Sequence, residues 1–272
     1  MHLDNRTKQL LKRYRIFPRK RLGQNFMIDE GYVQDMASYG HLNMSDTVLD
    51  IGAGLGALTK ILSPLCSKVI AVEIDHKLAE VSRIETRDSE NVSLIEGDIL
   101  ETAIPTFNKV VSNPPFNISS PILFWLLEKK FDSAVMTFQK EFAERLVALV
   151  GSKDYSRLTV ETYYRAEVEL MKIVPKDAFI PSPDVDARIV RLKPRKTSPF
   201  NVKNEELFHE LVRVLFTQRN KKTRNAVASL LRKLGKRKED ADSLLFHDKR
   251  VRELAPEDFA EMANELMTWN IS

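Results

Sequence analysis

The stretch Thr47-Val-Leu-Asp-Ile-Gly-Ala-Gly-Leu-Gly56 decides the fold. Its apolar start is typical of a buried strand, and the glycines that follow indicate a tight turn before a helix. Gly52, Gly54 and Gly56 let the backbone pass close to a ligand where a Cβ atom would collide. The spacing differs from the Gly-x-Gly-x-x-Gly of dinucleotide-binding loops, and no Lys-Ser/Thr pair follows as in nucleotide-phosphate loops. A purely structural glycine turn stays open from this stretch alone.

Around this stretch, apolar runs typical of strands alternate with helical patterns over the first two-thirds of the chain. This alternation predicts an α/β fold with a mostly parallel, seven-stranded sheet and helices on both faces. The connection 175–183 between the last two runs holds three prolines and is too short for a crossover helix, so we expect a hairpin at the sheet edge. The predicted strands are 48–52, 69–74, 92–96, 109–113, 133–138, 168–174 and 188–192.

The pattern changes after Pro194, where a basic linker at 193–199 precedes a stretch with helical periodicity only. We therefore expect one domain over residues 1–194, which begins with a basic segment at 1–22, and a small all-α domain over residues 195–272. The helices predicted in the second domain are 205–216, 222–234, 240–246 and 256–269.

Composition excludes several classes of protein. With 272 residues, 43% of them hydrophobic, the chain can bury a core and is not globally disordered. The single cysteine, Cys66, rules out an intramolecular disulfide or a four-cysteine metal site and favours the reducing cytoplasm. The five histidines show no ligand spacing, so no metal is expected. The apolar runs are too short to cross a bilayer, and residues 1–21 lack the apolar stretch of a secretory signal, so no membrane partner is expected.

Positive charge is concentrated in two segments. Residues 1–22 hold eight Lys or Arg and one acid, and residues 217–238 hold nine and no acid, although the net charge of the chain is only +4. Two basic segments on an otherwise acidic chain predict a polyanionic partner that is held at two places. The alternative for either segment is a solvated helix face or a loose N-terminal tail.

Two carboxylates follow the next two predicted strands. Glu73 ends the strand after the glycine turn, where it can accept hydrogen bonds from both hydroxyls of a ribose. Asp98 lies just past the third strand, where it can accept a hydrogen bond from an exocyclic adenine amine. An exposed strand-end acid is the alternative for Glu73 alone. The glycine loop lacks the pattern of a phosphate-binding loop. Together with this loop, Glu73 and Asp98 resemble the S-adenosylmethionine site of class I methyltransferases more than an NAD site.

The tetrapeptide Asn113-Pro-Pro-Phe116 ends the fourth strand and indicates chemistry on an aromatic amine. The lone pair of such an amine is delocalised into its ring, and an acceptor for each N–H favours a pyramidal nucleophile. The Asn113 side-chain oxygen and the Pro114 carbonyl can be these two acceptors, on a loop that two prolines stiffen. Phe116 can stack on a flipped base. No general base with a shifted pKa and no metal is needed. The alternative is a rigid turn without chemistry.

Several stretches resemble the ribosomal RNA adenine N6,N6-dimethyltransferases, over about residues 15–265. The N-terminal stretch Arg19-Lys-Arg-Leu-Gly-Gln-Asn-Phe-Met-Ile-Asp29 is similar to the signature of that family. Further similar stretches are Asn117-Ile-Ser-Ser-Pro121, Gln139-Lys-Glu-Phe-Ala-Glu-Arg-Leu-Val147, Asp154-Tyr-Ser-Arg-Leu-Thr159, Ala178-Phe-Ile-Pro-Ser-Pro-Asp-Val185 and Phe216-Thr-Gln-Arg-Asn-Lys-Lys-Thr-Arg224.

The resemblance implies S-adenosylmethionine as methyl donor and two adjacent adenosines near the 3′ end of small-subunit rRNA, in the assembling subunit, as substrate. It implies that Asn25 and Met27 line the cofactor site with Gly52, Gly54, Glu73, Asp98 and Asn113, and that Phe179 stacks on the target base opposite Phe116. A core aromatic is the alternative for Phe179. We expect a monomer. The residues expected to hold RNA are Arg19, Lys20, Arg21, Arg219, Lys221, Lys222 and Arg224.

One residue departs from the pattern of that family, which usually has Leu or Ile where this chain has Pro114. The resulting tetrapeptide is similar to that of DNA adenine-N6 and protein-glutamine methyltransferases, which leaves the substrate and the number of methyl groups open on this motif. Because residue 114 contributes a main-chain carbonyl, its hydrogen bond can survive, and the flanking motifs favour the rRNA family. The alternatives are a DNA adenine-N6 methyltransferase and a non-catalytic RNA-binding assembly factor.

Overall fold

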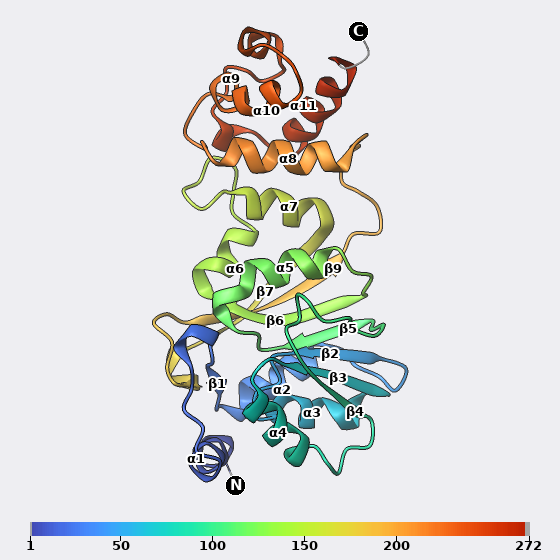
Figure 1. Ribbon diagram of the computed structural model, residues 1–272, viewed down its shortest axis with the longest axis vertical. Coiled ribbons are helices and arrows are strands. Elements are labelled where there is room, and N and C mark those ends of the chain that lie inside the picture. The colour runs from blue at the N-terminus through green and yellow to red at the C-terminus, as the bar shows by residue number, and fades with distance from the viewer. Residues whose placement is uncertain (1, 270–272) are drawn as a thin grey trace. The chain divides into compact units, whose positions relative to one another are not determined.

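The computed structural model describes residues 2–269, and the chain divides into two compact units (Figure 1). The first unit comprises Met1–Ala143 and Val168–Pro194, and the second comprises Glu144–Glu167 and Arg195–Ser272. The domain boundary that the sequence predicts near Pro194 falls at one of the breaks between the units. Residues 144–167 differ from that prediction, because they belong to the second unit rather than the first.

The packing of α7 (Arg157–Arg165) explains this difference. Val160 and Tyr164 of this helix are buried in the same cluster as Phe208 of α8 (Glu205–Phe216), and the Tyr155 hydroxyl donates to the Leu254 carbonyl at 2.8 Å. A helix that follows a strand looks in sequence like a crossover helix of the sheet. Here its apolar face is buried among the C-terminal helices instead.

The first unit is built on a seven-stranded sheet with the order β4-β3-β2-β5-β6-β9-β7, in which each predicted run is a strand. Strands β4, β3, β2, β5 and β6 are mutually parallel, and β9 runs antiparallel to β6. Strands β7 and β9 are neighbours at one edge, as the short connection between them predicts. The bounds are β2 Thr47–Ile51, β3 Lys68–Glu73, β4 Val92–Glu96, β5 Lys109–Ser112, β6 Ser133–Gln139, β7 Ala166–Val174 and β9 Ala187–Pro194.

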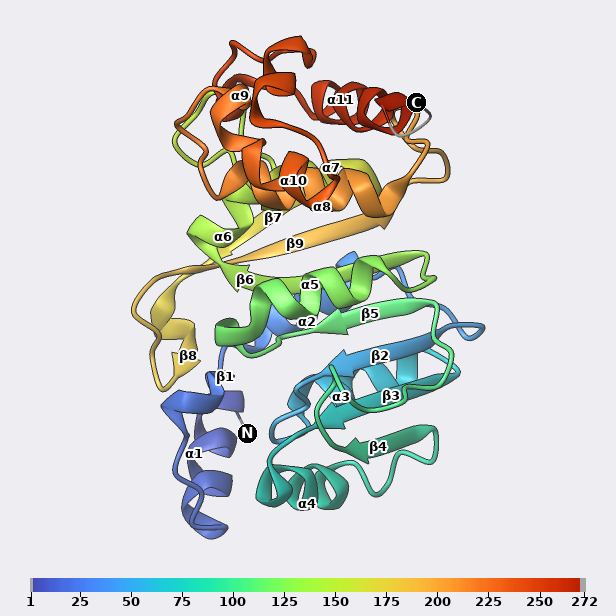
Figure 2. The same ribbon diagram turned by 45° about the horizontal axis from the view of Figure 1, so that its top comes forward.

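Helices cover both faces of this sheet (Figure 2). Helices α2 (Glu30–Tyr39) and α3 (Ala57–Leu62) contact β2, β3, β5 and β6 on one face, and α5 (Ser119–Leu127) lies on the other. The central strands are therefore buried on both sides, which explains their nearly continuous apolar sequence. Asp29 and Asp75 cap the first turns of α2 and of α4 (His76–Glu85) by accepting hydrogen bonds from backbone N–H groups.

The N-terminal segment is ordered against the first unit, which excludes the loose tail for α1 (Leu3–Arg13). Leu10 and Ile16 pack with Leu55, Leu78 and Val81. Further along, the two-residue strand β1 (Phe26–Met27) pairs antiparallel with β8 (Phe179–Ile180), so that Met27 lies opposite Phe179.

The second unit is helical, but two of its predicted helices differ from the structure. The predicted helix 222–234 is divided at Val227 into α9 (Thr223–Ala226) and α10 (Ala228–Lys233). The predicted helix 240–246 is instead a 3₁₀ segment, Lys238–Ser243. The Asp240 carboxylate accepts the Arg237 backbone N–H at 2.8 Å, a local bond that competes with α-helical pairing.

The remaining helical elements are short, apart from α11 (Pro256–Thr268). Within residues 2–269 no helix combines the length and the apolar character that a membrane crossing requires. The other segments are α6 (Lys140–Leu146) and the 3₁₀ turns Lys20–Leu22, Ser63–Leu65, Phe116–Ile118, Lys176–Ala178 and Val251–Glu253.

Candidate active site

A cavity opens in the first unit at the carboxyl ends of β2, β3 and β5, the edge where parallel sheets bind ligands. The N-terminal stretch 22–27 forms part of its wall. The cavity therefore brings together motifs that lie far apart in the sequence. The predicted site residues that line it are Asn25, Met27, Gly52, Gly54, Glu73, Asn113 and Pro114.

The glycine turn is required by backbone conformation and by space. Gly52 and Gly54 have φ angles of +77° and +58°, which L side chains rarely adopt. A Cβ atom on Gly52 would lie 3.0 Å from the Pro115 ring, and one on Gly54 would lie 3.2 Å from the Phe26 ring. The turn thus lets the tetrapeptide Asn113–Phe116 and β1 approach the end of β2 closely.

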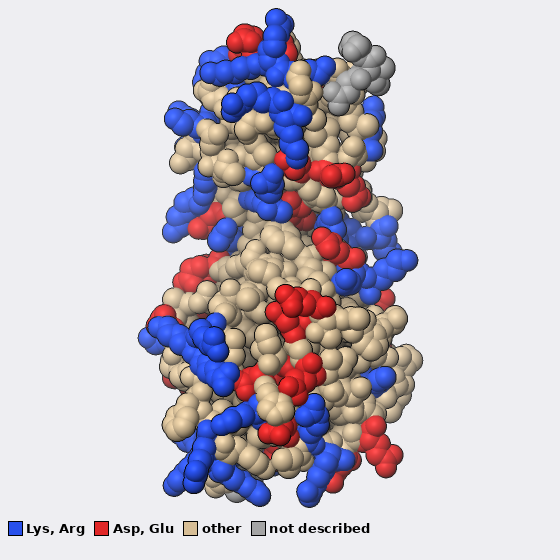
Figure 3. Space-filling model, viewed as in Figure 1, with Lys and Arg blue, Asp and Glu red and all other residues tan. Residues whose placement is uncertain are grey.

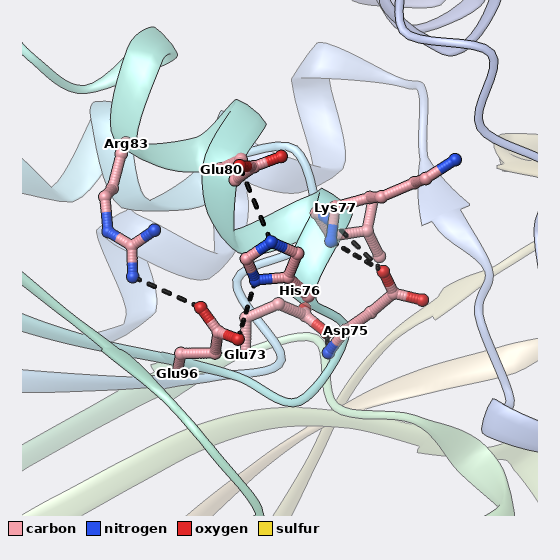
Figure 4. Close-up of polar contacts among 8 residues, drawn as sticks. Glu73, Asp75, His76, Lys77, Glu80, Arg83 and Glu96 are labelled. Carbon is pink, nitrogen blue, oxygen red and sulfur yellow. Dashed lines mark hydrogen bonds and ion pairs between the residues drawn. The ribbon is translucent and has the colours of Figure 1, made fainter.

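The Glu73 carboxylate is buried at the end of β3 and held by the backbone (Figure 4). Its two oxygens accept hydrogen bonds from the Gly54 and Asp75 N–H groups, each at 2.8 Å. Burial raises the pKa of this carboxyl group, and the backbone hydrogen bonds act in the opposite direction. Because each carboxylate oxygen has further lone pairs, both can still accept a donor from a ligand in the cavity.

Glu96, the register partner of Glu73 on β4, lies in different surroundings. It is exposed and accepts hydrogen bonds from His76 Nδ1 at 2.8 Å and from Arg83 at 3.4 Å, as the close-up shows (Figure 4). These contacts raise the pKa of His76 and lower that of Glu96. Glu96 does not line the cavity. The two acids at the strand ends therefore differ in their surroundings: Glu73 is buried beside the cavity, and Glu96 is exposed.

Asp98 lies beyond the end of β4 and is not among the residues that line the cavity. Its carboxylate accepts the Leu100 N–H at 2.9 Å, and the Gly97 N–H donates to the Glu73 carbonyl at 2.9 Å. The loop is therefore tied to the end of β3. The role of Asp98 as an acceptor for an adenine amine stays a prediction.

The Asn113 side chain is held at both ends of its amide. Its Nδ2 donates to the Asn25 carbonyl at 3.2 Å, and its Oδ1 accepts a hydrogen bond from the Thr137 hydroxyl. Sequence reasoning missed Thr137, although a hydroxyl residue in the apolar run 134–138 was a visible signal. Pro114, the second predicted acceptor, is buried in the cavity wall.

Phe116 and Phe179, expected on opposite sides of a target base, contact each other directly in this structure. Their ring centroids lie 5.8 Å apart with an interplanar angle of 73°, an edge-to-face arrangement. Both rings are buried, so Phe179 is also a core aromatic. A base stacked between two rings needs about 7 Å between them, twice the carbon contact distance, so the rings must separate and rotate to admit one.

Asp50 is a second residue that sequence reasoning missed. This acid interrupts the apolar run of β2, is 1% exposed, and accepts a hydrogen bond from the Thr59 hydroxyl at 2.7 Å. Burial raises its pKa to about 7, and the nearby negative charge of Glu73 adds to that rise. Asp50 lines the cavity.

Among the described residues no group of three or more His, Cys, Asp or Glu side chains is arranged to hold a metal ion.

The residues expected to hold RNA fall into two sets. Arg19 forms an ion pair with Asp75 at 3.2 Å, and Arg219 donates to the Ser152 and Lys153 carbonyls at 2.9 and 2.6 Å. Lys222 and Arg224 pair with Asp248 at 2.8 and 3.2 Å. In contrast, the structure gives no side-chain partner within residues 2–269 to Lys20, Arg21 or Lys221.

Lys and Arg side chains gather over α1 and over α9 and α10 on the face shown in Figure 3.

Arg219 donates hydrogen bonds to the carbonyls of residues 152 and 153, in the same loop as Leu149, which is 80% exposed. Arg219 therefore has a structural role in shaping this loop of the second unit, which its position in a basic run did not indicate.

The seven-stranded sheet, the glycine turn after β2 and the carboxylate at the end of β3 define a class I methyltransferase fold. The chain belongs to the ribosomal RNA adenine dimethylase family, whose model matches residues 17–268. The resemblance seen in the sequence and the predicted fold class are therefore both confirmed.

Curated relatives and solved structures agree with this assignment. The chain is 44% identical over 262 residues to a probable ribosomal RNA small subunit methyltransferase A of Methanosarcina mazei, with 95% of this chain and 96% of that protein covered. It is 38% identical to the protein of the same name from Thermococcus kodakarensis, with 96% and 94% covered. A dimethyladenosine transferase from Plasmodium falciparum has 31% identity and a TM-score of 0.77, with 88% and 96% covered. The 23S rRNA methyltransferase ErmE has 28% identity and a TM-score of 0.66, with 89% and 99% covered.

The raised pKa of Asp50 predicts a specific pH dependence of stability. The folded chain keeps this proton up to about pH 7, whereas the unfolded chain loses it near the ordinary aspartate pKa of 3.8. The stabilisation is therefore complete below about pH 4 and is lost as the pH rises through 7, by about 4 kcal/mol in all. We expect Asp50→Asn to remove this part of the decline, as measured by urea unfolding at pH 5 and pH 8. Parallel pH profiles for the two proteins would contradict the assignment.

Proposed function

We propose that this protein transfers methyl groups to N6 of two adjacent adenosines near the 3′ end of small-subunit rRNA, in the assembling small ribosomal subunit. The observation that carries the proposal is the Asn113 amide, fixed by Asn25 and Thr137 at the edge of the cavity beside the Gly52 turn. The family and the names of its relatives support the choice of rRNA over DNA.

The cavity suits S-adenosylmethionine as the methyl donor, which supplies an electrophilic methyl group on a sulfonium when bound. Gly52 and Gly54 line the cavity with backbone alone, in a positive-φ turn, and Glu73 offers two buried carboxylate oxygens. We assign the ribose hydroxyls to Glu73 and the adenine amine to Asp98. Asn25 and Met27 would close the cavity from the N-terminal side.

The residues of the tetrapeptide would act on the target amine. Asn113 Oδ1 and the Pro114 carbonyl each accept one N–H of adenine N6, which localises the nitrogen lone pair for attack on the methyl group. Their positions are fixed before the reaction, so little reorganisation is needed as charge develops. The N6-methylated adenine cation loses its proton readily, so no side chain is required as a general base.

Entry of the base would use Phe116 and Phe179. Flipping a base out of the RNA has an unstacking cost, and stacking on aromatic rings offsets part of it. Because the two rings now contact each other, we propose that the incoming base replaces that contact and lies between them.

The unpartnered basic side chains would hold the RNA backbone. Lys20 and Arg21 follow α1 in the first unit, and Lys221 precedes α9 in the second. We propose that the second unit is an RNA-binding domain and that the protein acts as a monomer in the cytoplasm. The buried, reduced Cys66 is compatible with that compartment.

Removal of the Glu73 carboxylate tests the cofactor assignment. We expect Glu73→Gln to weaken S-adenosylmethionine binding by about 10–100-fold, because hydrogen bonds to a charged acceptor are lost. Isothermal titration calorimetry measures the affinity. Glu96→Gln is the matched control, because Glu96 is the register partner of Glu73 but does not line the cavity. Equal affinity of Glu73→Gln and the wild-type protein would refute the ribose contact.

The mechanism predicts the effect of Asn113→Ala. We expect turnover to fall by about 10²–10³, as for loss of a comparable preorganised contact. The assay incubates the protein with small subunits from cells that lack the modification and measures N6,N6-dimethyladenosine by mass spectrometry of nucleosides. Thermal unfolding checks that the variant is folded. Near-normal turnover of the Asn113→Ala variant would exclude the mechanism. The same assay on duplex DNA tests the alternative substrate: methyl uptake by DNA rather than by subunits would favour a DNA methyltransferase.

Adjacent lysines test which side chains contact RNA phosphates. Lys221 has no described partner, whereas Lys222 is paired with Asp248 at 2.8 Å. We therefore expect Lys221→Ala to weaken RNA binding and to reduce the slope of log K against log salt concentration by about 1, the change for one lost phosphate contact. Lys222→Ala should change the slope less. Filter binding at several salt concentrations measures both, and identical slopes for wild type and Lys221→Ala would exclude that contact.

A further inference from the structure

The strand next to the catalytic tetrapeptide carries a hydroxyl that contacts the active site. Ser112 and Met136 are register partners on β5 and β6, so the next residues along these parallel strands, Asn113 and Thr137, lie side by side. The Thr137 hydroxyl donates a hydrogen bond to Asn113 Oδ1. Thr137 is completely buried, and the residues flanking it, Met136 and Phe138, are apolar and fully buried.

These contacts select one orientation of the Asn113 amide. The oxygen and nitrogen of an Asn side chain are similar in shape but opposite in hydrogen bonding. A hydroxyl donor at one end and the Asn25 carbonyl at the other are complementary only when Oδ1 faces Thr137 and Nδ2 faces Asn25. The same two contacts limit rotation of the side chain. An oxygen that accepts from Thr137 keeps a second lone pair for an N–H of the substrate.

We infer that Thr137 is a positioning residue that holds Asn113 Oδ1 in place for the target amine and thereby supports the second methyl transfer in particular. The inference rests on the proposed function. An unmodified adenine N6 has two N–H groups, for Asn113 and Pro114. A monomethylated N6 has only one, so it makes one hydrogen bond fewer to the two acceptors. We assign this remaining bond to Asn113, so its alignment depends more strongly on a fixed amide.

The test compares Thr137→Val, which keeps the shape and removes the hydroxyl, with Thr137→Ser, which keeps the hydroxyl. Ser133→Ala is the matched control, because Ser133 lies on the same strand and its hydroxyl contacts Lys109 rather than the site. Full-length proteins act on small subunits that lack the modification. The measured quantities are kcat, KM for S-adenosylmethionine and the ratio of mono- to dimethyladenosine.

For Thr137→Val we expect kcat to fall about tenfold, the loss for one hydrogen bond in a preorganised site, while KM changes less than about twofold. Monomethyladenosine should accumulate. Thr137→Ser and Ser133→Ala should both remain within about twofold of the wild type. A merely structural role would not produce this combination, because altered packing would not be rescued by serine or shift the product ratio.

A second measurement keeps the inference testable if the valine variant is poorly folded. In an Asn113→Ala background the hydroxyl has no amide to hold, so Thr137→Ser and Thr137→Ala should then have equal rates. Unequal rates there, or a Thr137→Val enzyme with wild-type kcat and product ratio, would overturn the inference. If the wild-type protein itself forms no N6,N6-dimethyladenosine on subunits, the proposed function fails, which is a separate outcome.

Discussion

The close approach of three segments at the end of β2 is the constraint on which the candidate site depends. Pro115 and Phe26 come so near to Gly52 and Gly54 that a Cβ atom at either position would make a tight contact, at 3.0 and 3.2 Å, and would push these neighbours away. The Gly54 N–H then donates to the Glu73 carboxylate, which ties the turn to the end of β3. A side chain at either glycine would move the tetrapeptide, the N-terminal strand or the carboxylate. The turn thus positions together the residues that we propose to bind the cofactor and those that we propose to act on the target amine.

The parts of the fold that could be predicted from sequence are those encoded locally. A buried parallel strand needs a continuous apolar run, and positive-φ turns favour glycine, so β2 and its turn were predictable without knowledge of the rest. The partners of Asp50 and Thr137 were not predictable, because they depend on side chains that folding brings close. Residues 144–167 were misplaced for a related reason, since an amphipathic helix does not specify which apolar surface it covers.

The partners of the basic surface residues were also not predictable from the sequence, because they too depend on side chains that folding brings close. A run of positive charge predicts a polyanion partner on average, but some of its side chains interact with acids and carbonyls of their own unit instead. Arg219 donates hydrogen bonds to the carbonyls of residues 152 and 153, and Lys222 forms an ion pair with Asp248. Lys221, which lies between them in the sequence, has no partner among the described residues. Counterion release depends on how many charges reach the phosphates, so only the unpartnered side chains contribute fully.

Under the proposed mechanism, proline at residue 114 is compatible with the chemistry of the family, because the contact that we assign to this residue comes from the main chain. A change from Leu or Ile to Pro alters the cavity wall, where the ring now lies, but leaves the carbonyl acceptor in place. It also limits backbone movement at the position where the second acceptor must be fixed. On this account the first acceptor needs a corresponding restraint, and the hydroxyl of Thr137 and the carbonyl of Asn25 provide it from the two sides of the Asn113 amide.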